Sequence, residues 1–114
     1  MVGCQAAGTA LVVDPRRDID IYREIAASQG LAIVGVAETD IHADYLSGAR
    51  ELASAVGARL YLSDEGGGAW KYAGLDGLDV QLVRDGDDLS FGAVQVTVWH
   101  TPGHTPEHVA FVVT

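Results

Sequence analysis

The chain is poor in positive charge. Seven lysine and arginine residues stand against sixteen aspartate and glutamate residues, so the formal net charge is -9 at pH 7. A surface of this sign repels phosphate groups, which opposes binding to nucleic acid or to anionic membranes. We therefore expect the partners to be proteins or small molecules.

Cysteine and long apolar runs are also scarce. Cys4 is the single cysteine, so the chain can form no internal disulfide, and a reducing, cytoplasmic location is the natural interpretation. No segment approaches the roughly 18 uninterrupted apolar residues that a membrane-spanning helix requires. The amino terminus lacks the basic and apolar regions of a signal peptide. We expect no membrane association.

The length of 114 residues allows one domain with a modest core. No internal repeat, low-complexity segment or linker divides the chain, so residues 1–114 are predicted to form a single domain. Short segments that are rich in β-branched residues and bounded by Gly, Pro or Asp predict strands. These segments are 9–13, 31–36, 80–83, 94–99 and 109–113.

Apolar residues at helical spacing predict two helices, at residues 19–28 and 43–56, which end before Gly30 and at Gly57. Asp18 is the predicted N-cap of the first helix. The apolar face of that helix is expected to comprise Ile19, Tyr22, Ile25 and Ala26.

Several predicted strands are apolar at nearly every position, as strands covered on both faces are. One face of the sheet would pack against the chain's own helices. The other face has no evident partner in the sequence, and a bare apolar face is an interface or an aggregation liability. We therefore expect a homodimer, or a complex with a complementary half-domain, in which two sheets stack.

Three potential metal ligands follow the apolar segment 31–36. Asp40, His42 and Asp44 occupy alternate positions, so in an extended segment their side chains lie on one side. Carboxylates and imidazoles are suitable ligands for zinc or iron(II). Asp44 also has a simpler interpretation, because an aspartate at the start of a helix is more often an N-cap than a metal ligand.

A second histidine-bearing segment lies far along the chain. Residues 100–106 read H-T-P-G-H-T-P, and the proline-glycine turn before His104 fixes the direction of that histidine. His104 is therefore a candidate fourth ligand. His100 is interpreted as a residue that hydrogen-bonds the loop, and His108 either supports a ligand or is exposed. Residues 84–88 predict a tight turn rather than a calcium site, because they lack the length and the terminal glutamate of an EF-hand loop. Residues 90–93 predict a reversal between the next two strands.

These segments resemble a known family. Residues 39–45 read T-D-I-H-A-D-Y and resemble the T-H-x-H-x-D-H motif of the metallo-β-lactamase fold superfamily, in its persulfide dioxygenase and glyoxalase II-like branch, which is often fused to rhodanese domains. The branch's second motif reads H-T-P-G-H-T-P, as residues 100–106 do. Residues 14–18 resemble its D-P-x-R-D turn, and residues 46–53 resemble the helix after its ligands. The matches follow one another in the expected order.

The resemblance implies an α/β fold, namely half of an αββα sandwich, with a mixed β-sheet and helices on one face. It also implies that Asp40, His42 and His104 hold a first metal. Asp44 would be the ligand that remains of a second site and would act in catalysis by orienting the nucleophile. The chain departs from the family at two ligands, because Asp40 and Tyr45 stand where the family has histidines. The family's later aspartate and final histidine have no counterpart in the chain.

With two ligands replaced and two without a counterpart, we expect at most one zinc or iron(II) ion per chain, or none, with weak binding and impaired turnover. The alternative is an active metal-dependent hydrolase or sulfur dioxygenase. By resemblance, its substrate would be a glutathione-derived small molecule, either a thioester or a persulfide. That activity requires a second copy or a partner chain that supplies the missing ligands.

Overall fold

The structure is a computed structural model that describes residues 1–16, 18–39, 48–63, 78–101 and 109–113. Within these ranges the chain forms strands and helices in the following order: β1 (Val2–Cys4), β2 (Thr9–Val13), α1 (Asp20–Ser28), β3 (Ala32–Ala37), α2 (Ala49–Val56), β4 (Arg59–Ser63), β5 (Val80–Val83), β6 (Asp88–Phe91), β7 (Val94–His100) and β8 (Val109–Val113).

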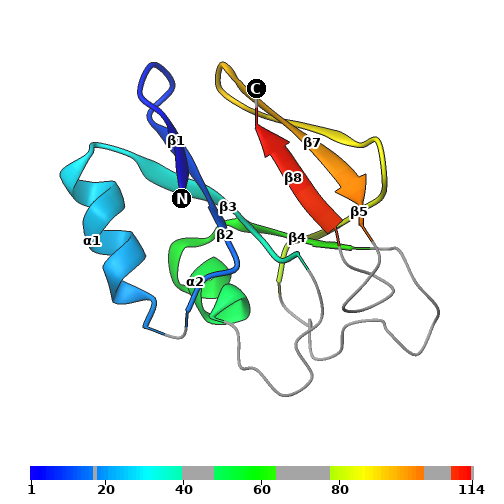
Figure 1. The fold of residues 1–114 in the computed structure, drawn as a ribbon. Helices are drawn as coiled ribbons and strands as arrows, with labels where there is room; N and C mark the ends of the chain where they lie inside the picture. The colour runs from blue at the N-terminus through cyan, green and yellow to red at the C-terminus, as the bar shows by residue number, and fades with distance from the viewer. Residues whose placement is uncertain (17, 40–47, 64–77, 102–108, 114) are drawn as a thin grey trace.

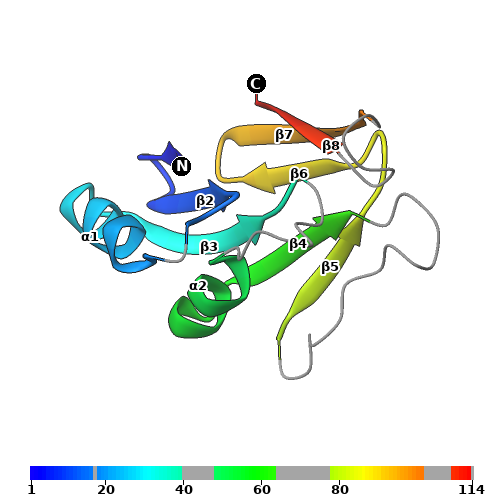
Figure 2. The ribbon, with the colours of Figure 1, turned by 60° about the horizontal axis from the view of Figure 1, so that its bottom comes forward.

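The strands form two sheets. Strands β1 to β5 are neighbours in chain order and make a mixed sheet, in which β1 is antiparallel to β2 and the others are parallel. Strands β6, β7 and β8 make an antiparallel sheet. The helices α1 and α2 cover one face of the first sheet, and the second sheet lies on the opposite face (Figures 1 and 2). The result is a layered α/β arrangement, as the resemblance implied.

The first sheet separates two apolar cores, because alternate strand residues point to opposite faces. Between this sheet and the helices lie buried residues that include Val36, Leu52 and Leu60. Between the two sheets lie buried residues that include Ala37 and Phe91. The face that we expected to need a second chain is thus covered by the chain's own β6 to β8, and that expectation of a bare face is wrong.

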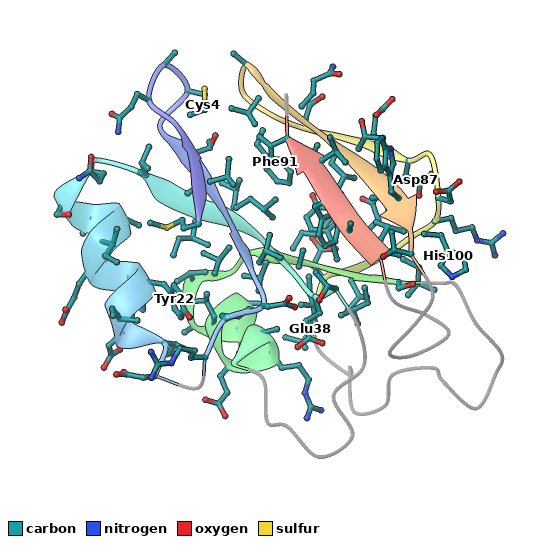
Figure 3. All side chains as sticks on the ribbon, viewed as in Figure 1. Cys4, Tyr22, Glu38, Asp87, Phe91 and His100 are labelled. Atoms are coloured by element: carbon teal, nitrogen blue, oxygen red, sulfur yellow. The ribbon has the colours of Figure 1, made fainter. Side chains whose placement is uncertain are left out.

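The two sheets approach each other closely at Gly35. A Cβ atom built there would lie 2.8 Å from Cε1 of Phe91 and 3.0 Å from Cε2 of Tyr61, so a larger residue would overfill the core. The rings of Phe91 and Tyr61 meet edge to face, with centroids 5.8 Å apart. Phe91 lies between the sheets in Figure 3. Glycine at this position therefore allows the second sheet to pack on the first.

Helix α1 differs in detail from its prediction. Its N-cap is Ile19, with no side-chain capping bond, so the prediction that Asp18 is the cap is wrong. Ala26 is buried, and Ile19 and Tyr22 pack against the core as expected. Ile25 is instead 43% exposed, because the buried stripe of this helix is narrower than its apolar pattern. The helix is followed by Gly30, whose positive φ of 68° ends it as predicted.

Helix α2 begins at Ala49 rather than at residue 43, and its N-cap is Gly48. Asp44, for which we considered a capping role, lies outside the described residues. A Cβ atom at Gly48 would lie 2.0 Å from the backbone oxygen of Arg16, so only glycine fits where the helix starts. Leu52 and Ala53 are buried, as apolar residues at helical spacing predict.

Among the strands, β2, β5 and β8 have the predicted bounds, and β3 and β7 are shifted or extended by one residue. Strands β1, β4 and β6 were not predicted. The turn predicted at residues 84–88 is present at residues 84–87, where the backbone N–H of Arg84 donates to Oδ2 of Asp87 at 2.8 Å, while Asp88 already belongs to β6. The reversal predicted at residues 90–93 is narrower, because Phe91 still belongs to β6. No helix in the described part of the chain is long and apolar enough to cross a membrane.

Candidate metal centre

The parallel strands β2 and β3 end at the same edge of the first sheet. Asp14 follows β2 directly, and Glu38 and Thr39 follow β3. In open α/β sheets, ligands bind outside the carboxyl ends of the parallel strands. Glu38 lies on this side of the molecule in Figure 3, and so does His100, the last residue of β7. Both sheets therefore contribute residues to one edge.

Asp14 holds Thr39 through two hydrogen bonds. The Thr39 backbone N–H donates to Oδ1 of Asp14 at 2.8 Å, and the Thr39 hydroxyl donates to Oδ2 at 2.6 Å. The backbone N–H of Asp14 donates to the carbonyl of Ala37 at 2.8 Å. Asp14 adopts a positive φ of 50°, which aspartate tolerates better than most residues. The turn after β2 thus fixes the residue that precedes the predicted ligand Asp40.

Thr39 also joins the two sheets. Its carbonyl accepts a hydrogen bond of 2.7 Å from the backbone N–H of Val109, the first residue of β8. Thr39 directly precedes Asp40, and Val109 directly follows the segment 102–108 that contains His104. The bond therefore brings one end of each predicted ligand segment to the same place.

The far end of the first ligand segment is held by the same turn. The backbone N–H of Gly48 donates to the carbonyl of Pro15 at 2.9 Å. The adjacent Arg16 donates its backbone N–H to the hydroxyl of Tyr22 at 2.7 Å, which ties the turn to α1. Residues 14–16 therefore anchor Thr39 on one side and Gly48 on the other. The segment between them contains Asp40, His42 and Asp44.

The predicted ligands themselves, Asp40, His42, Asp44 and His104, lie outside the described residues, as do Tyr45 and His108. Among the residues that the structure does describe, no group of three or more His, Cys, Asp or Glu residues could hold a metal ion. The structure therefore brings together the residues that flank the ligands and leaves the ligand set itself a prediction.

Two described residues at this edge add detail. The backbone N–H of His100 donates to Oδ1 of Asp85 at 2.8 Å, which ties the end of β7 to the turn before β6. The interpretation that His100 bonds the loop before His104 stays a prediction, because residues 102–108 lie outside the described residues. Glu38 is a carboxylate with only 7% of its surface exposed, and sequence reasoning missed it. Thr39 was missed as well. Their position in the sequence could have identified them, because polar residues directly after a buried parallel strand lie at the edge of the sheet where ligands bind.

Comparison with known proteins identifies the family. The sequence profile described as the Metallo-beta-lactamase superfamily matches residues 4–113. The chain belongs to the metallo-beta-lactamase superfamily. It is 36% identical to a hydroxyacylglutathione hydrolase of Gloeobacter violaceus over 108 aligned residues. The aligned region covers 94% of this chain and 40% of the relative. A hydroxyacylglutathione hydrolase of Rhodospirillum rubrum is 31% identical over 111 residues, which covers 97% of this chain and 41% of the relative.

Solved structures agree with this superfamily fold. A metallo-beta-lactamase from Staphylococcus aureus superposes with a TM-score of 0.89 at 39% identity, over 98% of this chain and 33% of that one. ETHE1 from Myxococcus xanthus superposes with a TM-score of 0.79 at 26% identity, over 98% of this chain and 46% of that one. The chain therefore spans less than half the length of these relatives. It has the layered arrangement of the superfamily over that part.

Proposed function

We propose that this metallo-beta-lactamase half-domain holds one zinc or iron(II) ion weakly, through Asp40, His42 and His104, and has little or no turnover by itself. The observation that supports the proposal is the position of Thr39. Its hydrogen bonds to Asp14 and Val109 join the ends of both ligand segments. Such anchoring of the residues next to the ligands lowers the entropy that metal binding must remove.

The donor set fits one cation. One carboxylate and two imidazoles are a ligand combination found in zinc and iron(II) sites, and three protein ligands leave a position open. A bound metal supplies a Lewis acid and lowers the pKa of a coordinated water. In the proposal, Asp44 orients the nucleophile, while Asp14 and Pro15 position the segment that contains the ligands. A second metal would have only Asp44 from the family's usual set.

The second candidate function is hydrolysis of a hydroxyacylglutathione thioester, or oxidation of a glutathione persulfide, by a completed site. Its support is the 36% identity to a hydroxyacylglutathione hydrolase. It requires a homodimer or a complementary half-domain that supplies further ligands. We also propose a cytoplasmic location, because Cys4 is a free thiol and the chain has no other cysteine.

Metal content per chain tests the proposal. Tag-free protein is sized by light scattering, and zinc and iron are then measured by inductively coupled plasma mass spectrometry. We expect at most one metal per chain, removed by His104→Ala and retained more tightly in Asp40→His, which restores the family's histidine. Metal content that is indifferent to both substitutions would contradict the ligand assignment.

Activity assays distinguish the two candidates. The purified chain is assayed with S-lactoylglutathione and with glutathione persulfide, before and after saturation with zinc or iron(II). The half-domain proposal predicts no metal-dependent turnover with either substrate. Turnover that is abolished by both His104→Ala and dilution below the dimer dissociation constant would support the completed site instead.

A further inference from the structure

A cleft of about 330 Å³ lies at the end of the first sheet opposite to Asp14 and Thr39. It is formed where the amino-terminal ends of the parallel strands meet the turn between β6 and β7. Figure 3 shows Phe91, one of its lining residues, well away from Glu38 and His100. The cleft is lined by Thr9, Val34, Gly57, Arg59, Tyr61, Asp79, Ser90, Phe91 and Gly92. It is a separate feature that shares none of the residues of the metal edge.

The backbone is irregular at this cleft. In the pairing of β2 with β3, Ala10 faces Ile33 and Leu11 faces Gly35, so Val34 is an extra residue in a β-bulge. Bulges often lie next to binding sites, where they redirect a side chain. Val34 is 38% exposed and lines the cleft. Together with Phe91, which also lines the cleft, it provides an apolar part of the wall.

A further feature of the cleft is the hydroxyl group of Thr9. The hydroxyl oxygen of Thr9 is buried, yet it makes no hydrogen bond within the part of the chain that the structure describes. A buried hydroxyl without a partner is costly and calls for an explanation, such as a ligand or water that completes it. Thr9 lines the cleft, but its Oγ1 exposes less than 1 Å² of surface, so it is a polar atom behind the wall and not a contact of a molecule bound in the cleft.

The mouth of the cleft carries one charge of each sign. Nε of Arg59 donates to Oδ2 of Asp79 at 3.1 Å, and Nη1 donates to Oε1 of Gln81 at 3.3 Å. The Arg59 and Asp79 side chains are 48% and 64% exposed. An ion pair this exposed contributes little stability, so exchanging it for contacts with a ligand costs little. A guanidinium has five donor N–H groups, which allows Arg59 to bind a carboxylate as well.

We propose that this cleft binds a small zwitterion, an α-amino acid or a dipeptide with an apolar side chain. The ligand carboxylate binds Arg59, its ammonium group binds Asp79, and its side chain packs on Val34 and Phe91. The volume lies at the lower end of the range for ligand pockets, which is roughly 300–1,000 Å³, so it suits a molecule of this size. The strongly acidic chain, with a formal charge of -9, disfavours multiply charged anions but not a neutral zwitterion.

L-leucine is the probe for the first test. The full chain, labelled with ¹⁵N and kept metal-free by a chelator, is titrated with L-leucine, with N-acetyl-leucine and with leucinamide, and amide chemical shifts are followed. We expect saturable shifts at Thr9, Gly57 and Gly92 with L-leucine. Each analogue lacks one charge, so its affinity should be at least about tenfold lower, the factor that a charge-assisted hydrogen bond contributes.

Variants assign the binding to the cleft. Arg59→Met and Asp79→Asn should each weaken L-leucine binding by at least about tenfold. Arg23→Met is the matched control, because Arg23 pairs with Asp20 at 3.8 Å in an ion pair of similar exposure that lies outside the cleft; it should bind like the wild type. The dispersion of each amide spectrum reports whether the variant is folded. If Arg59→Met does not fold, Asp79→Asn still tests the proposal.

Several results would overturn the proposal: no saturable shift at millimolar L-leucine, shifts confined to residues outside the cleft, analogues that bind as tightly as L-leucine, or unchanged binding in the folded variants. Because the titration is done without metal, its failure is independent of the metal-binding proposal. Loss of metal binding in His104→Ala would likewise leave the cleft proposal intact.

Discussion

Replacing Asp14 by alanine should destabilise the protein more than any comparable change on its surface. The carboxylate accepts both the backbone N–H and the hydroxyl of Thr39, at 2.8 and 2.6 Å, in a partly buried position. Asp14→Ala leaves both donors without their acceptor. It also places alanine at a φ of 50°, where a β-carbon is strained and where aspartate is better tolerated.

The magnitude follows from these two contributions. A hydrogen bond to a charged group contributes about 1.5–3 kcal/mol, and partial access to water reduces the two bonds together to about 2–3 kcal/mol. The backbone contribution adds about 1 kcal/mol for alanine in the left-handed region. We therefore expect a loss of about 3–4 kcal/mol in the free energy of unfolding for Asp14→Ala, and about 2–3 kcal/mol for Asp14→Gly, in which glycine removes the strain.

Urea denaturation measures both values. With a slope of roughly 2 kcal/mol per molar urea, the midpoint of Asp14→Ala should fall by roughly 1.5–2 M. Asp88→Ala is the control, because Asp88 also accepts a hydrogen bond from a threonine hydroxyl, that of Thr97 at 2.7 Å, but in an exposed position. Its cost should stay below about 1 kcal/mol. Equal midpoints for Asp14→Ala and Asp88→Ala would refute the anchoring role of Asp14, and equal midpoints for Asp14→Ala and Asp14→Gly would refute the backbone contribution.

Three further predictions concern the core, the helix start and pH. Gly35→Ala should lower stability by about 1–3 kcal/mol through overpacking, because its Cβ would lie 2.8 Å from the Phe91 ring; thermal melting should show partial rescue by the second change Phe91→Leu, and no rescue would contradict the steric explanation. Gly48→Ala should lower stability at least as much as Gly35→Ala, because its Cβ would lie 2.0 Å from the backbone oxygen of Arg16. Truncating the neighbouring side chain by Ile19→Ala should not restore stability, because the clash is with backbone. A melting temperature within error of the wild type would be inconsistent with the observed helix start. Burial raises the pKa of the Tyr61 hydroxyl. The stability that the neutral hydroxyl contributes is therefore fully present below the unfolded tyrosine pKa of about 10, and it is lost as pH rises through the higher folded pKa. Urea midpoints measured from about pH 9 upwards should fall more steeply in the wild type than in Tyr61→Phe, and parallel curves would contradict the raised pKa.

The packing of the second sheet shows where sequence reasoning reached its limit. Residues 94–99 and 109–113 were recognised as strands by their composition, but β6 was taken partly as a turn. Its alternation of Leu89 and Phe91 with polar residues covers only four positions, which is too short to outweigh the turn residues around it. Missing β6 removed the evidence that the chain can cover its own first sheet.

The start of α2 illustrates the same limit in another way. The helical spacing of apolar residues continues back to Leu46, so the sequence favoured an earlier start. The observed start at Ala49 depends on the contact between Gly48 and the backbone of Arg16 and Pro15. Residues more than thirty positions apart are in contact there, and helix propensity, which depends on the local sequence, does not predict such contacts.

The sequence by itself determined the periodicity of most strands and both helices, the types and order of the candidate ligands, and the likeness to the family. These properties are local, or they are carried by short motifs, so they can be recognised without coordinates. Only the tertiary structure decided that the chain's own second sheet covers the first, that Thr39 connects Asp14 to Val109, and that a cleft opens at Val34. Each of these results depends on contacts between distant segments, whose closure is set by the packing of the whole domain and not by any single segment.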